Sequence, residues 1–266
     1  MVRAKGSLLF NRVLVPLDGS LAAEQIVPYA LALAKGMGAE LRLLRVISMA
    51  PLAGYYLSGG IDWEGIEKLM LGEAQAYLEE VKPRLNLEGT QITTSVSEGL
   101  TASSIISESN SMEGTLVAMT THARSGVSKG IIGSVTDDVL RNGDVPMLVV
   151  RSTDEDAEAI VPELDTIVLA LDGSDLAETV LPHAVAVARA LDLKFDLLTV
   201  LPADDPAFVN VSVSSEVRDN ALDYLQSVED KLAEQGISRV AQAILHGQAA
   251  GAVIDLTDNL AGAMIA

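Results

Sequence analysis

A loop rich in glycine follows an apolar run near residue 116. Residues 116–136 read LVAMTTHARSGVSKGIIGSVT, and Gly126 and Gly133 would let a ligand approach the backbone closely. A helix predicted from Ser134 would add N–H groups with partial positive charge, and Arg124 would neutralise further negative charge. Glycines, helix N–H groups and a nearby cation together indicate a cradle for phosphate.

The same residues allow an interpretation without a ligand. Ser134 and Asp137 are spaced as in a capping box, in which the two residues satisfy the first N–H groups of a helix. Asp137 and Asp138 would also oppose a phosphate placed too close to them. Both interpretations stay open at the level of the sequence.

A second polar element follows the first apolar run of the chain. Residues 12–17 predict a buried strand, and Asp18, Gly19 and Ser20 close it with a turn. An acidic side chain at such a strand end can accept a hydrogen bond from a ribose hydroxyl. Asp18 could equally stabilise the turn itself, as Asx residues do. Asp172 repeats it in a second copy that lacks the glycine-rich loop, so a folding role for Asp-Gly-Ser is supported at least as well as a ligand role.

The chain repeats itself at a shift of 154 residues. Residues 13–20 (VLVPLDGS) align with residues 167–174 (IVLALDGS), and 13 of the 35 positions from Val13 to Ile47 are identical in the two copies. Unrelated segments of this length would share about two or three positions. The repeat therefore indicates a duplicated domain.

Apolar runs and helical patterns alternate through both copies. This alternation predicts two Rossmann-like, doubly wound parallel α/β sheets in tandem, with ligands expected at the carboxyl ends of the strands. The second copy ends at a segment matching the fourth strand of the first, so it is predicted to lack the last helix and strand. The predicted domains are residues 1–152 and 165–266, joined by an acidic linker over 153–164. In the first copy we expect strands at 12–17, 40–47, 91–95, 115–120 and 146–150, and helices at 20–37, 63–85, 101–109 and 134–142. In the second copy, residues 165–201 repeat the first part of the domain. They are followed by a helix at 216–234, a strand at 238–245, a helix at 249–259 and a segment at 262–266 that aligns with the fourth strand.

The composition excludes several classes of protein. The net charge of −19 disfavours nucleic acid and anionic membranes as partners. The chain has no cysteine, which excludes disulfides, thiolate metal sites and cysteine nucleophiles. No apolar stretch reaches the length of a membrane span, and residues 1–12 lack the features of a signal peptide, so we expect a cytoplasmic protein.

Other catalytic and metal motifs find little support. Residues 126–130 (GVSKG) match the pattern of a hydrolase nucleophile elbow, but the serine lies too far beyond the strand for that geometry. His122, His183 and His246 show no metal-ligand spacing, so no protein metal site is expected. Neither a Walker A loop nor a GxGxxG motif occurs.

Four segments together resemble the universal stress protein family in its tandem form. They are residues 15–20 (VPLDGS), 119–126 (MTTHARSG), 133–135 (GSV) and 145–150 (VPMLVV). Members that bind ATP carry a Gly-x-x-Gly loop followed by Gly-Ser or Gly-Thr, hold adenine against backbone after the second strand and place an aspartate near the ribose.

The resemblance implies ATP in the first domain, with Mg²⁺ arriving only together with the nucleotide, and no catalytic residues. Ala123 and Thr120 depart from the glycines expected there, and the spacer from Gly126 to Gly133 is short. If these departures abolish binding, no cofactor is expected. The nucleotide-binding residues that we predict are Pro16, Leu17, Asp18, Val46, Met119, Thr120, His122, Arg124, Gly126, Gly133, Ser134, Val135 and Thr136.

Three functions follow from these predictions. The first is a stress-response or regulatory protein that binds one adenine nucleotide per chain without catalysis. The second is a scaffold that acts through dimer surfaces and needs no nucleotide. The third, a slow ATPase, ranks last because the loop offers no well-placed general base. The apolar edge strand at 146–150 predicts a homodimer or a pseudo-dimer within the chain.

Overall fold

The computed structural model describes residues 9–49, 62–85, 89–121, 133–152, 163–202, 215–257, 260 and 262–266. The chain divides into two compact units, Met1–Val161 and Pro162–Ala266, called unit 1 and unit 2 below. The predicted linker lies mostly outside the described residues and stays a prediction.

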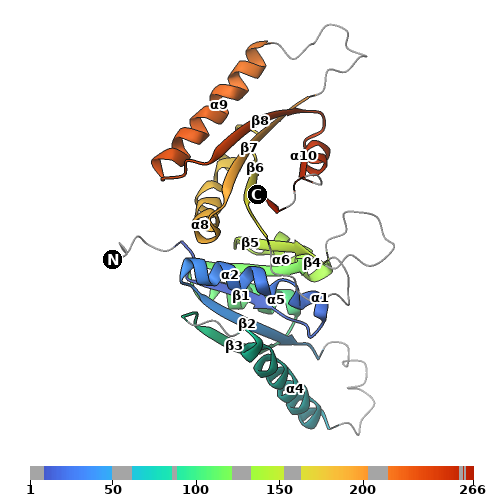
Figure 1. Ribbon diagram of the computed structural model, residues 1–266. Coiled ribbons are helices and arrows are strands. Elements are labelled where there is room, and N and C mark those ends of the chain that lie inside the picture. The colour runs from blue at the N-terminus through green and yellow to red at the C-terminus, as the bar shows by residue number, and fades with distance from the viewer. Residues whose placement is uncertain are drawn as a thin grey trace. The chain divides into compact units, whose positions relative to one another are not determined.

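Unit 1 contains a five-stranded parallel sheet with the strand order β3-β2-β1-β4-β5 (Figure 1). Its chain first builds one side of the sheet, crosses back, and then extends the other side. This order confirms the doubly wound parallel fold and puts the reversal between β1 and β4. The elements are β1 (Arg12–Pro16), α1 (Leu21–Glu24), α2 (Val27–Met37), β2 (Glu40–Ile47), α4 (Trp63–Arg84), β3 (Ile92–Glu98), α5 (Thr101–Asn110), β4 (Thr115–Thr121), α6 (Ser134–Asn142) and β5 (Met147–Arg151).

Aliphatic side chains on both faces of the strands build the core of unit 1. Leu14 of β1 packs with Ile105 of α5 and Val139 of α6 in one buried cluster. Val13 and Val15 alternate with Leu14 and are also fully buried, while α2 contacts β1 and α4 contacts β2. Burial on both faces explains why the strands are continuous apolar runs.

The single helix predicted for residues 20–37 is in fact two helices, α1 and α2. Pro28 stands in the first turn of α2. A proline has no N–H to donate, and its ring clashes with the carbonyl four residues earlier, so a continuous helix is broken before it. Pro182 marks the same break in unit 2.

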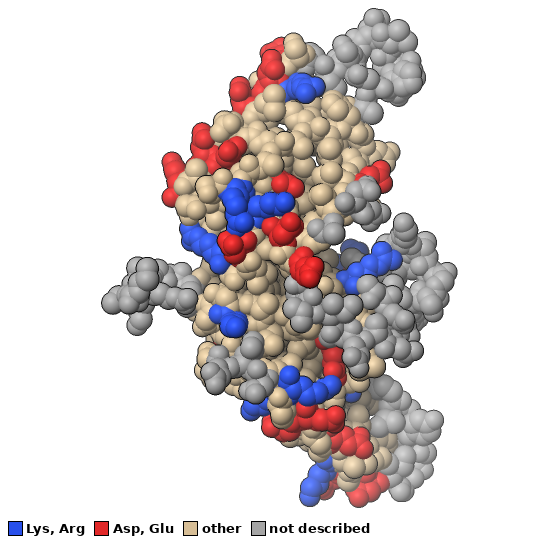
Figure 2. Space-filling view, in the orientation of Figure 1, with Lys and Arg blue, Asp and Glu red and all other residues tan. Residues whose placement is uncertain are grey.

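Unit 2 repeats the architecture with a four-stranded parallel sheet in the order β8-β7-β6-β9. As predicted, the segment near residue 264 takes the place of the fourth strand, and the described residues of unit 2 form no counterpart of α6 or β5. Figure 2 shows acidic side chains along the outer face of its long helix α9. The elements are β6 (Thr166–Ala170), α7 (Asp175–Glu178), α8 (Leu181–Leu191), β7 (Lys194–Leu201), α9 (Ser215–Glu234), β8 (Val240–His246), α10 (Ala249–Thr257) and β9 (Ala263–Ile265).

Other elements begin and end close to their predicted positions. The third strand is the clearest exception, because β3 runs on to Glu98 and pairs with β2 from Leu41 to Ile47. Within the described residues, no helix is both long and apolar enough to cross a membrane.

Candidate functional site

The carboxyl ends of β1 and β4 bring the predicted site residues to one edge of the sheet in unit 1. The two strands are parallel neighbours, with Leu14 beside Val117, and they end at Pro16 and Thr121. The turn at Asp18 follows one strand, and α6 begins after the other. This is the reversal point of the sheet, where α/β proteins bind ligands.

The carboxylate of Asp18 stabilises its own turn. Its Oδ1 accepts hydrogen bonds from the backbone N–H of Ser20 at 3.0 Å and from the Ser20 hydroxyl at 2.6 Å. The Ser20 Oγ in turn accepts from the N–H of Ala23 and caps α1. Gly19 between them has a φ of +86°, which favours glycine.

Unit 2 contains the same turn in nearly identical geometry. Asp172 Oδ1 accepts from the Ser174 N–H at 2.9 Å and from its hydroxyl at 2.6 Å. The hydroxyl hydrogen bond from Ser174, with help from its N–H, lowers the pKa of Asp172 below its usual value. The Asp-Gly-Ser sequence is therefore a folding element of both units.

The backbone of Leu17 already has partners on β2. Its N–H donates to the Leu44 carbonyl at 2.8 Å, and its carbonyl accepts from the Arg45 guanidinium at 3.2 Å. Sequence reasoning missed Arg45, although its charge among the apolar residues at the carboxyl end of β2 was the available signal. Its guanidinium also lies 3.7 Å from the position that a Cβ at Gly19 would occupy.

The first turn of α6 is held by the backbone and one threonine. Gly133, not Ser134, occupies the N-cap position, and no side chain caps the helix among the described residues. The capping box is therefore not formed, and Asp137 bonds to Arg141 instead. The exposed Ser134 and the N–H groups beside it remain able to face an anion.

Thr136 connects α6 to the end of β4. Its hydroxyl donates to the Thr120 carbonyl at 3.1 Å, and both side chains are buried. Thr120, where the family pattern favours glycine, is thus accommodated in the interior. The Thr136 hydroxyl orients the helix rather than facing solvent.

The apolar residues predicted for the site belong to the core or its margin. Met119 is buried, and Val46 and Val135 pack against the same cluster as Met119. Pro16 is half-buried at the last position of β1. The Met119 side chain is buried, while Pro16, Val46 and Val135 are partly exposed. His122, Ala123, Arg124 and Gly126 lie outside the described residues.

The comparison with family models decides the relationship. The model of the universal stress protein family matches residues 9–151 and again residues 163–266. The chain belongs to the universal stress protein family. Both units match it, so the predicted tandem arrangement is confirmed.

Individual relatives agree with this assignment. The universal stress protein MJ0531 of Methanocaldococcus jannaschii is 30% identical over 146 residues, which cover 55% of this chain and 85% of the relative. The universal stress protein YxiE of Bacillus subtilis is 27% identical over 148 residues, which cover 54% of this chain and all of the relative. A crystal structure of a universal stress protein from Archaeoglobus fulgidus is similar in fold over 93% of this chain and 83% of its own, with a TM-score of 0.69 and 22% identity.

A cluster of polar side chains connects α1 to α4 in this universal stress protein. It consists of Glu24, Arg45, Tyr77 and Arg84. The Tyr77 hydroxyl donates to Glu24 at 2.9 Å, and Arg84 pairs with the same carboxylate at 3.1 Å. Arg45 lies over the Tyr77 ring, 5.8 Å from its centre, in a cation–π contact. Burial, followed by the bond to Glu24, raises the pKa of Tyr77 well above its usual value.

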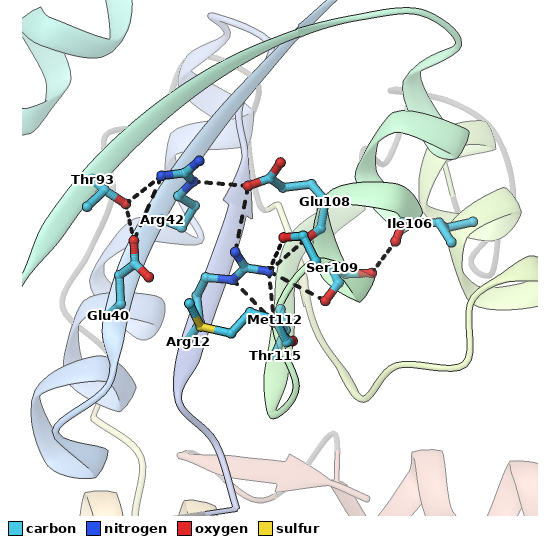
Figure 3. Close-up of polar contacts among 10 residues, drawn as sticks. Arg12, Glu40, Arg42, Thr93, Ile106, Glu108, Ser109, Met112 and Thr115 are labelled. Carbon is cyan, nitrogen blue, oxygen red and sulfur yellow. Dashed lines mark hydrogen bonds and ion pairs between the residues drawn. The ribbon is translucent and has the colours of Figure 1, made fainter.

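A second polar cluster lies at the opposite, amino-terminal ends of the strands (Figure 3). The buried Arg12 donates to the Glu108 carbonyl at 2.6 Å and to the Thr115 hydroxyl at 3.0 Å. Arg42 pairs with the Glu108 carboxylate at 3.1 Å and bonds to Thr93. Burial lowers the pKa of Arg12, and the nearby Glu108 opposes that shift.

This cluster caps the end of α5 and is occupied with its own contacts. Because it lies at the edge away from the reversal point, it is a structural feature and not a ligand site. The described residues contain no group of three or more acidic or histidine side chains that could hold a metal ion.

Proposed function

We propose that unit 1 binds one adenine nucleotide, ATP, without catalysis, and that the chain acts as a cytoplasmic regulatory protein of the stress response. The observation that carries this proposal is the first turn of α6, which has a glycine N-cap and no side-chain cap among the described residues. It faces the reversal edge beside the Asp18 turn. Such N–H groups, with their partial positive charge, suit a phosphate group.

The two units differ at this feature, which predicts one nucleotide per chain. Unit 2 has the turn at Asp172, but its described residues form no counterpart of α6. The described residues at the second edge therefore offer no helix N-terminus of this kind for a phosphate. Any Mg²⁺ would be bound through the nucleotide.

A nucleotide-independent scaffold is the second candidate. The observation that favours it is the engagement of Asp18 Oδ1 and of both backbone groups of Leu17 in contacts within the protein. These contacts already occupy one oxygen of the Asp18 carboxylate, which is predicted to bond to the ribose. The scaffold would act through a dimer, and the edge strand β5 is its predicted surface.

Calorimetry on the full chain decides between the two candidates. We expect ATP to bind with a stoichiometry of one and with no release of ADP above background. Gly133→Asp should weaken binding at least about tenfold, because its carboxylate would stand where the phosphate charge is expected. Gly133→Asn is the matched control, since its side chain has the same shape without the charge.

A second pair of variants separates the two units. Asp18→Asn should weaken ATP binding, whereas Asp172→Asn should leave it unchanged. Two bound nucleotides per chain, or equal binding by Gly133→Asp and Gly133→Asn, would contradict the proposed site. No nucleotide bound by the wild-type protein would favour the scaffold.

A further inference from the structure

The guanidinium of Arg45 is held in a fixed position beside the Asp18 turn. It donates to the Leu17 carbonyl at 3.2 Å, lies over the Tyr77 ring, and lies 3.7 Å from the position that a Cβ at Gly19 would occupy. Tyr77 is itself fixed by its hydrogen bond to Glu24. A planar cation held by a hydrogen bond and a cation–π contact loses little further freedom when a ligand binds near it.

Unit 2 satisfies the corresponding carbonyl without a charge. Thr199 occupies the position equivalent to Arg45, and its hydroxyl donates to the Leu171 carbonyl at 3.0 Å. Leu171 is the equivalent of Leu17, and its N–H makes the same bond to β7 that the N–H of Leu17 makes to β2. A neutral threonine therefore suffices to hold this turn, so the charge of Arg45 is not needed for the fold.

None of the described residues forms a close ion pair with Arg45. Among the described residues, no carboxylate oxygen lies within 4.0 Å of its guanidinium nitrogens. The chain as a whole carries a net charge of −19, which repels anions. A fixed cation at the ligand edge of unit 1 would offset this repulsion locally, and unit 2 has none at the equivalent position.

We propose that Arg45 is a specificity-determining residue that makes unit 1 prefer phosphorylated nucleotides over the uncharged nucleoside. This inference rests on the proposed nucleotide site and adds the reason why binding depends on ligand charge. Arg45 acts through its electrostatic field at the turn, while its hydrogen bond to Leu17 holds the guanidinium in place. The preference should grow with the number of phosphate charges.

The test measures the binding of ATP, AMP and adenosine to the full chain by calorimetry. Arg45→Thr copies the arrangement of unit 2 and should keep the Leu17 carbonyl satisfied. We expect it to weaken ATP about five- to tenfold, AMP less, and adenosine less than about twofold. Arg45→Lys, which keeps the charge, should stay within about threefold of the wild type for ATP.

Other outcomes are informative in distinct ways. An equal loss of ATP and adenosine affinity in Arg45→Thr would assign Arg45 a purely structural role and overturn the inference. Unchanged affinities would overturn it as well, while leaving the nucleotide site intact. If Arg45→Thr does not fold, Arg45→Gln, with its own hydrogen-bond donor, gives the same comparison. A wild-type chain that binds none of the three ligands would remove the proposed function itself.

Discussion

The two units of this universal stress protein share one turn and differ in the charges around it. Asp18 and Asp172 bond their following serines in the same way, so the turn is needed for folding wherever the domain occurs. The adjoining carbonyl is bonded by Arg45 in unit 1 and by Thr199 in unit 2. The comparison separates what the fold requires from what unit 1 alone could use for a ligand.

The amino-terminal edges of the sheets differ even more. In unit 1 the buried Arg12 holds the end of α5 and pairs with Glu108. Thr166 occupies the equivalent position in unit 2 and bonds to Asp165, which pairs with Lys194 at an exposed site. Unit 1 thus contains a buried charge network at this edge, whereas the ion pairs among the described residues of unit 2 are exposed or partly exposed.

Replacing Arg12 with the threonine of unit 2 should have the largest effect on stability. Arg12→Thr would leave Glu108 without one of its cations and the last carbonyls of α5 without a donor. We expect unit 1 to lose about 3 kcal/mol of unfolding free energy. Urea unfolding followed by the fluorescence of Trp63, the single tryptophan of the chain, measures it.

Arg141→Ala provides the control for that measurement. This arginine pairs with Asp137 one helical turn away, and its side chain is 73% exposed. Loss of this exposed ion pair should change the midpoint of urea unfolding little. If Arg12→Thr were as mild as Arg141→Ala, the contrast between a buried and an exposed network would be lost.

The two equivalent tyrosines should respond differently to loss of the hydroxyl. Tyr77 donates to Glu24, so Tyr77→Phe should cost about 1.5 kcal/mol. The buried Tyr224 hydroxyl makes no well-formed hydrogen bond in the described part of the chain, although Glu178, which bonds to Lys231, lies near it. Tyr224→Phe should therefore be neutral or slightly stabilising, as thermal unfolding of both variants would show. Equal losses of stability in the two variants would mean that the tyrosine hydroxyl stabilises both units to the same extent.

The smallest effect concerns alkaline pH. Burial, then the bond to Glu24, raises the pKa of Tyr77, while in the unfolded chain it titrates near about 10. Above that pH the unfolded state loses a proton that the folded state keeps, so stability falls as pH rises. Tyr77→Phe should make this fall in stability less steep between about pH 9 and 11. Urea unfolding followed by Trp63 fluorescence at each pH measures it. An unchanged slope would show that Tyr77 does not contribute to it.

Much of the fold could be predicted from local patterns. The repeat, the apolar strands and the turn at Asp18 all depend on neighbouring residues, and α6 begins and ends where predicted. The break between α1 and α2 was missed although Pro28 signals it. Burial along α4 is confined to Ala74, Leu78 and Val81, while Leu69 is 61% exposed, so an apolar residue in this helix does not by itself mark its buried face.

The candidate site was only partly predictable. The sequence placed Asp18 and Gly133 at one edge, since the carboxyl ends of parallel strands share it. It left open whether Ser134 caps its helix, and the structure puts Gly133 in that position. The predicted residues His122, Arg124 and Gly126 lie outside the described residues and stay predictions.

By itself, the sequence determined that this protein is a duplication of one parallel α/β domain with a shared Asp-Gly-Ser turn. Only the tertiary structure decided the contacts that distinguish the two copies. Arg45 reaches Leu17 across 28 positions of the chain, and Arg12 reaches Thr115 across 103. Such contacts arise when strands pair and helices pack, so no periodic pattern in the sequence records them. The charge of Arg45 is visible in the sequence, but the carbonyl that it bonds and the threonine that replaces it in unit 2 become visible only in the fold.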